Sequence, residues 1–130
     1  NIYLNRDNGI PEFIVEKTIR ARERHHQSIK MFYKAGGKIA MGTDAGTPFN
    51  VHGDNSQELQ FMTDLGISNS DALRFSTASA ADLMGLEDRG QIQEGFFADL
   101  LIVSGNPVED ISAIANQDNH LSLVKNGVQV

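Results

Sequence analysis

The stretch that decides the fold runs from Lys38 to Glu58 and reads KIAMGTDAGTPFNVHGDNSQE. Three apolar residues in succession, Ile39 to Met41, are followed by Gly42, and an aspartate comes two residues later. An apolar run without alternation is typical of a parallel strand that is buried on both faces. We therefore expect a strand over residues 38–42, followed by a loop rich in glycine and polar groups.

Asp44 has two interpretations on the residues alone. At the carboxyl end of a parallel strand, its carboxylate would point into the crevice where α/β proteins bind ligands. There it could bind a divalent metal or accept a proton from metal-bound water. Alternatively, it begins an ordinary turn and bonds to nearby backbone N–H groups. One carboxylate is not a metal site, because even a catalytic zinc has about three protein ligands.

The histidines are weaker candidates. His52 lies in the same loop as Asp44 and either contacts substrate or transfers a proton, or it is a solvated loop histidine. His25 and His26 are neighbours on a predicted helix, so they project about 100° apart and cannot chelate one ion together. His120 belongs to a turn-rich segment, where a surface loop explains it.

Helical patterns flank the Lys38–Glu58 stretch on both sides. A long helix is predicted from Pro11, with Gly36-Gly37 as its stop signal. Asn55 followed by Glu58 predicts a capping box for a helix over 56–65. Helix, strand, loop and helix in this order indicate an α/β fold.

A second capping box, Ser68 with Asp71, opens a helix that is expected to continue to about Met84. At the other end of the chain, Ile2 to Leu4 has the composition of a strand end.

After Leu86 the helical pattern gives way to turn residues and short apolar runs. Strands are expected over 98–103 and within 121–130, and a short helix within 108–115. The pair Asn126-Gly127 between apolar runs predicts a two-residue hairpin. We place a domain boundary at residues 86–89, which gives domains 1–87 and 88–130. One strand and a hairpin do not make a stable sheet alone, so this tail needs a further surface to lie against.

Composition excludes several function classes. The 130 residues carry a net charge of −6, which argues against nucleic acid and anionic membranes as partners. The sequence has no cysteine, so thiolate nucleophiles and cysteine-based zinc sites are excluded. No run of about 18 apolar residues is present, so no membrane span is expected. The chain begins with Asn1, so the lack of a signal peptide carries no meaning; the compartment stays open, with the cytoplasm favoured.

Three segments in order carry a resemblance to a known family: residues 36–86 around GTDAG, then RGQIQEGFFADLLIVSGNPVEDI, then LVKNGVQV. Together they resemble the C-terminal part of the amidohydrolase superfamily, in its prolidase-like and imidazolonepropionase-like branch. The similarity covers the chain from about Ser28 to its end.

The resemblance implies a fold and a chemistry. The fold would be the C-terminal part of a (β/α)₈ barrel plus part of a composite β-sandwich, with residues 38–42 as the eighth barrel strand. Asp44 would be the catalytic aspartate that binds a divalent metal, with zinc expected as one or two ions. His52 would be a substrate-binding residue at the mouth of the site. The implied function is hydrolysis of amide or peptide C–N bonds by metal-activated water, as in Xaa-Pro dipeptidases.

The sequence also departs from that family. The family's His-x-His pair, carboxylated lysine and two further histidines do not occur before Asp44, and a complete barrel needs about 250 residues. We therefore expect a fragment of an enzyme that is inactive alone. The alternatives are a cyclic-amide hydrolase or deaminase of the same superfamily, or a stand-alone α/β binding domain without catalysis. A small-molecule or dipeptide substrate is the expected partner, and homo-oligomer formation is left open.

Overall fold

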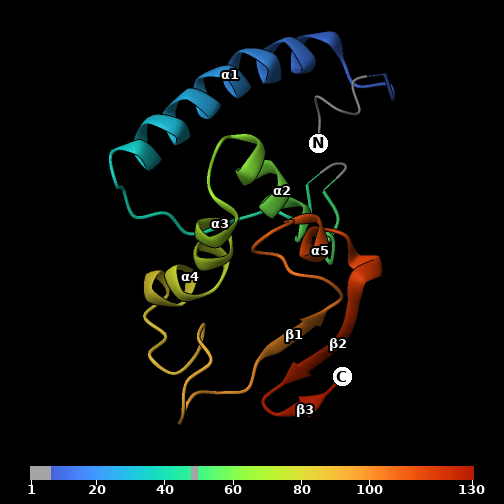
Figure 1. Cartoon of the computed structure of the whole chain (residues 1–130). Helices are drawn as coiled ribbons and strands as arrows, with labels where there is room; N and C mark the ends of the chain where they lie inside the picture. Colours follow the sequence, from blue (N-terminus) through green and yellow to red (C-terminus); the bar gives the residue numbers. More distant parts are fainter. Residues whose placement is uncertain (1–6, 48–49) are drawn as a thin grey trace. The chain divides into compact units, whose positions relative to one another are not determined.

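The computed structural model describes residues 7–47 and 50–130, and Figure 1 shows their helices and strands. In chain order these are α1 (Glu12–Lys34), α2 (Gln57–Asp64), α3 (Asn69–Ser76), α4 (Ala78–Leu83), β1 (Leu100–Val103), α5 (Ser112–Ala115), η1 (Gln117–Asn119), β2 (His120–Lys125) and β3 (Val128–Gln129). The predicted strand end at Ile2–Leu4 lies outside the described residues. No helix within those residues combines the length and apolarity needed to cross a membrane.

The chain divides into two compact units. One contains α1 and the loop Thr43–Asn55, and the other contains Lys38–Gly42 with Ser56–Val130. The buried apolar side chains, all in the second unit, are Leu59, Ile67, Ala72, Phe75, Ala81, Ile111 and Ala113. The predicted domain boundary at 86–89 falls inside this second unit and stays a prediction.

Helix α1 begins directly after Pro11 and ends at the predicted glycine pair. Gly36 has φ +73°, and its N–H bonds to the Tyr33 carbonyl at 3.0 Å. The Gly37 N–H bonds to the Phe32 carbonyl at 2.9 Å. These two bonds form a Schellman motif, which satisfies carbonyls that the helix end leaves without partners.

Of the two predicted capping boxes, the one at Ser68 has its N-cap bond confirmed. Ser68 accepts a hydrogen bond from the Asp71 N–H at 3.1 Å and caps α3. The Asn55 box is wrong: α2 has Ser56 at its N-cap position, without a side-chain capping bond. The Ser56 hydroxyl instead donates to the Ala115 carbonyl at 3.1 Å, so a long-range contact replaces the local one.

The helix predicted to run to about Met84 is two helices. Thr77, with φ −122° and ψ −92°, separates α3 from α4. The hydroxyls of Ser76 and Thr77 both donate to the Leu73 carbonyl, at 2.8 and 2.7 Å. Such bonds compete with the helical ladder and bend or end helices. Gly85, with φ +68°, follows the C-cap residue Met84 at the end of α4.

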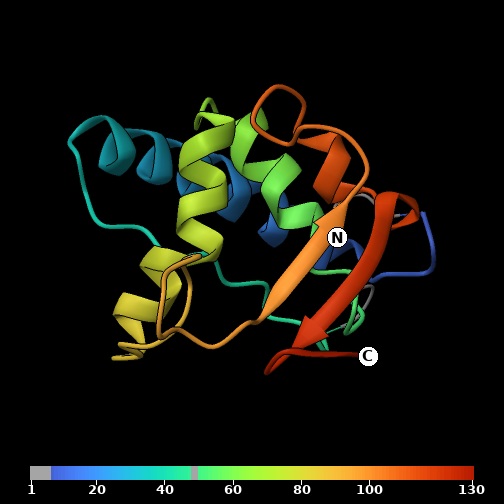
Figure 2. The same ribbon diagram turned by 60° about the horizontal axis from the view of Figure 1, so that its bottom comes forward.

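The tail forms a three-stranded antiparallel sheet in the order β1-β2-β3. Figure 2 shows β1 alongside β2, and Leu101 lies opposite Leu123 in their register. Asn126 and Gly127 have φ +51° and +78°, the two positive values that a type I′ turn requires. The hairpin prediction is therefore confirmed.

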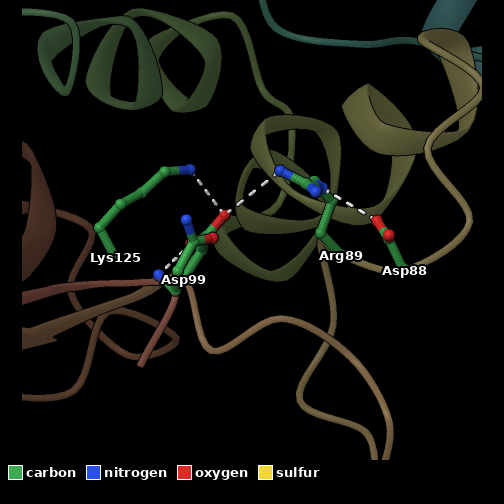
Figure 3. Close-up of polar contacts among 5 residues, drawn as sticks. Asp88, Arg89, Asp99 and Lys125 are labelled. Atoms are coloured by element: carbon green, nitrogen blue, oxygen red, sulfur yellow. Dashed lines mark hydrogen bonds and ion pairs between the residues drawn. The ribbon is translucent and has the colours of Figure 1, made fainter. Parts of the chain in front are cut away.

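A polar cluster holds the hairpin turn against the segment before β1 (Figure 3). Asp99 accepts hydrogen bonds from Lys125 Nζ and from the Asn126 backbone N–H, both at 2.9 Å. Arg89 lies 3.6 Å from Asp99 Oδ2 and 3.0 Å from Asp88 Oδ1. The Lys125 and Asn126 hydrogen bonds lower the pKa of the half-buried Asp99 carboxyl below its ordinary value.

One expectation for the first half of the sequence is not met. Residues 38–42 form no strand in the described part of the chain, because no neighbouring strand is there to pair with them. The Met41 N–H bonds instead to the carbonyl of Phe75, the penultimate residue of α3, at 2.9 Å. The fold is α/β as expected, and the described residues do not form a barrel.

Candidate functional site

Asp44 directly precedes a turn that begins at Ala45. Its φ of +51° is in the left-handed region, which costs an ordinary L-residue energy and which aspartate tolerates better than most. The side chain is exposed, and its carboxylate accepts no hydrogen bond from the described residues. The turn interpretation is therefore right about the backbone, but its expected carboxylate bonds to backbone N–H groups are not formed there.

Side chains further along the loop bond to the backbone at Asp44. The Thr47 hydroxyl donates to the Asp44 carbonyl at 3.1 Å. The Asn50 side-chain amide donates to the Thr43 carbonyl at 2.5 Å. Backbone bonds from Gly46 N–H to the Asn50 carbonyl, 2.8 Å, and from Asn50 N–H to the Thr47 carbonyl, 3.0 Å, close the loop. The sequence analysis missed Thr47 and Asn50. The only feature that could have pointed to them is a hydroxyl and an amide side chain within six residues of Asp44.

His52 is exposed, and its ring lies against the same turn. A Cβ placed on Gly46 would be 3.1 Å from His52 Nε2. The structure thus brings His52 beside the backbone two residues after Asp44, which is compatible with the predicted substrate contact without testing it.

The described residues do not form a metal site by themselves. No group of three or more His, Cys, Asp or Glu side chains in residues 7–47 and 50–130 is arranged to hold a metal ion. Asp44 fits as one ligand, because it offers an exposed carboxylate of the kind that divalent metals bind. The remaining ligands would have to come from outside these residues.

The other histidines have contacts of their own. The ring centroids of His25 and His26 are 6.3 Å apart on α1. Desolvation, followed by the charges of Arg22, His25 and Lys30, lowers the pKa of His26. His120 is partly buried, and its Nε2 lies 2.8 Å from the Ile114 carbonyl, so this ring has a structural contact rather than a place in an open loop.

Residues 3–130 match the model of the amidohydrolase family. The chain belongs to the amidohydrolase family. A similar curated protein is the ochratoxinase of Aspergillus niger, 34% identical over 92 residues, which are 68% of this chain and 18% of that protein.

Solved structures agree with this amidohydrolase assignment. A Xaa-Pro dipeptidase with methionine bound in its active site superposes with a TM-score of 0.83 at 35% identity, covering 95% of this chain and 30% of that one. A prolidase in complex with N-methylphosphonate-L-proline gives a TM-score of 0.81 at 27% identity, covering 94% and 30%. The predicted family and its prolidase-like neighbourhood are confirmed, and the chain spans less than a third of these relatives.

Proposed function

We propose that this amidohydrolase chain is the C-terminal part of a metal-dependent hydrolase that cleaves amide or peptide C–N bonds, with Xaa-Pro dipeptides as the first substrate class. The observation that carries the proposal is the superposition of 95% of the chain on a Xaa-Pro dipeptidase at 35% identity. Coverage of only 30% of that dipeptidase supports a larger whole protein.

In this proposal Asp44 is the carboxylate that the chain contributes to the metal site. When bound, a divalent metal such as zinc would polarise the scissile carbonyl and make water a stronger nucleophile. Asp44 would help to hold the metal, take a proton from the attacking water, and return it to the leaving amine. The exposed carboxylate, which has no hydrogen bond from the described residues, supports this role.

His52 is proposed as a substrate contact near Asp44. Its exposed ring lies against Gly46 and is a donor or acceptor for a polar group of the substrate. The similarity to ochratoxinase makes ochratoxin a second substrate to test. A cyclic amide and an aminated heterocycle test the remaining alternatives, a cyclic-amide hydrolase and a deaminase.

The test is a hydrolysis assay on the full-length protein loaded with zinc, using Xaa-Pro dipeptides, ochratoxin, a cyclic amide and an aminated heterocycle. We expect Xaa-Pro cleavage, and a loss of about 10²–10⁴-fold in kcat when Asp44→Asn removes the proton acceptor. The matched control is Asp64→Asn, which neutralises an exposed carboxylate at the end of α2. Cleavage of none of the substrates, or full activity of Asp44→Asn, would contradict the proposal.

A further inference from the structure

We propose that Thr47 and Asn50 are positioning residues that hold the backbone at Asp44 and thereby set how tightly the enzyme binds its metal. This inference rests on the proposed role of Asp44 as a metal ligand. It adds two residues that touch neither metal nor substrate but act through Asp44.

The backbone at Asp44 is in a conformation that needs support. Among the described residues, only Asp44 and Asn126 are non-glycine residues with positive φ. The hairpin explains Asn126, because a type I′ turn requires positive φ at that position. Asp44 belongs to none of the strand pairs in the described residues, so its conformation must be held by other contacts.

The two side-chain donors act on the peptide groups on either side of the Asp44 Cα atom. Asn50 donates to the Thr43 carbonyl, which belongs to the peptide group before Asp44. Thr47 donates to the Asp44 carbonyl, which belongs to the peptide group after it. The orientations of these two groups define φ and ψ of Asp44, so the two hydrogen bonds together fix the direction in which its Cβ leaves the backbone.

Both donors are themselves tied into the loop. The Asn50 N–H bonds to the Thr47 carbonyl at 3.0 Å, and the Asn50 carbonyl accepts from the Gly46 N–H at 2.8 Å. Metal affinity depends on such supporting contacts, and losing one typically costs 10–100-fold. The loop therefore holds the Asp44 backbone, and with it the direction of the Asp44 Cβ, before any metal arrives.

The experiment measures zinc dissociation constants by chelator competition, with kcat and KM, on the full-length protein. Asn50→Ala and Thr47→Val each remove one donor, and we expect zinc binding to weaken by about 10–100-fold in each. Thr47→Ser keeps the hydroxyl and should bind zinc like the wild type. The matched control is Asn119→Ala, which removes an amide that donates to the Ser112 carbonyl in the other compact unit and should change neither constant.

The outcomes separate this inference from the proposed function. If Asp44→Asn weakens zinc binding while Asn50→Ala and Thr47→Val bind zinc with wild-type affinity, the positioning role is overturned. That result leaves the proposed function untouched. Equal losses in Thr47→Ser and Thr47→Val also overturn the positioning role, because the hydroxyl would then be irrelevant. If Asp44→Asn binds zinc and turns over substrate as the wild type does, the proposed function fails and this inference fails with it.

Discussion

Gly46 shows how a single residue can shape the candidate site. Its φ of +98° disfavours any L-side chain, and a Cβ there would also approach His52 Nε2 to 3.1 Å. The residue is therefore constrained by its backbone conformation and by the neighbouring ring. Gly53 has nearly the same φ, +95°, with open space where its Cβ would be.

Comparing Gly46 with Gly53 distinguishes the effect of backbone strain from the effect of contact with the His52 ring. In the full-length protein, Gly46→Ala and Gly53→Ala should each lower the free energy of unfolding by about 1–3 kcal/mol through backbone strain. Only Gly46→Ala should also raise KM, because the added methyl group displaces the His52 ring. Thermal unfolding and steady-state kinetics measure both effects. Equal KM values in the two variants would remove the reason to assign His52 to the substrate.

At the scale of elements, the β2–β3 hairpin is held by charge as well as by strand pairing (Figure 3). Asp99 accepts from Lys125 and from the backbone of Asn126, and the Gly127 N–H bonds to the Ala98 carbonyl at 3.0 Å. The turn and the start of β1 are thus joined by side-chain and backbone bonds.

The lowered pKa of Asp99 predicts an acid-sensitive hairpin. Because the carboxyl has a lower pKa when folded than when unfolded, its stabilising contribution is present above about pH 4 and is lost as the pH falls through the folded pKa. In the full-length wild-type protein, hydrogen exchange of the Asn126 amide should become faster below about pH 4. This rate is corrected for the intrinsic pH dependence of amide exchange. Asp99→Asn should show faster exchange at neutral pH and no such acid step. Exposed Asp118 supplies the control substitution Asp118→Asn, and an unchanged acid step in Asp99→Asn would assign the effect to another group.

At the scale of the whole molecule, much apolar surface has no partner within the described residues. No residue of α1 is buried, and exposed apolar side chains on the sheet include Leu101, Leu121, Leu123 and Val128. In the register, Leu101 is opposite Leu123, and Val128 is opposite Lys125, so these residues share one face. An exposed apolar sheet face with open edges favours association.

The isolated 130-residue chain should therefore aggregate or pack loosely. We expect sedimentation to detect oligomers, a hydrophobic dye to bind, and urea unfolding to lack a steep transition. The full-length protein serves as the control and should unfold cooperatively. A soluble monomer of the isolated chain with one cooperative transition would show that these 130 residues form a complete core, which favours the stand-alone binding domain.

Local signals predicted much of this structure, and long-range contacts account for the errors. Gly36, Ser68 and the pair Asn126-Gly127 act within a few residues of themselves, so their predicted roles are confirmed. Residues 38–42 form no strand because a parallel strand depends on neighbours that its own sequence does not encode. Ser56 replaced the predicted Asn55 cap and bonds 59 residues away.

The candidate site also has a part that the sequence predicted and a part that only the folded structure shows. The sequence singled out Asp44 and His52 by residue type and by position in the loop. It missed Thr47 and Asn50, because their bonds to backbone carbonyls appear only once the loop is folded. The amidohydrolase family, predicted from three ordered segments, is confirmed over residues 3–130.

The central claim is that this chain is one part of a longer metal-dependent amidohydrolase. Native mass spectrometry of the protein purified from its source tests this most directly, because it measures the intact mass and the bound metal in one sample. We predict a mass well above the 14.2 kDa of these residues, with zinc or another divalent metal bound. A mass of 14.2 kDa without metal would contradict the claim and would leave hydrolysis to the relatives of this chain.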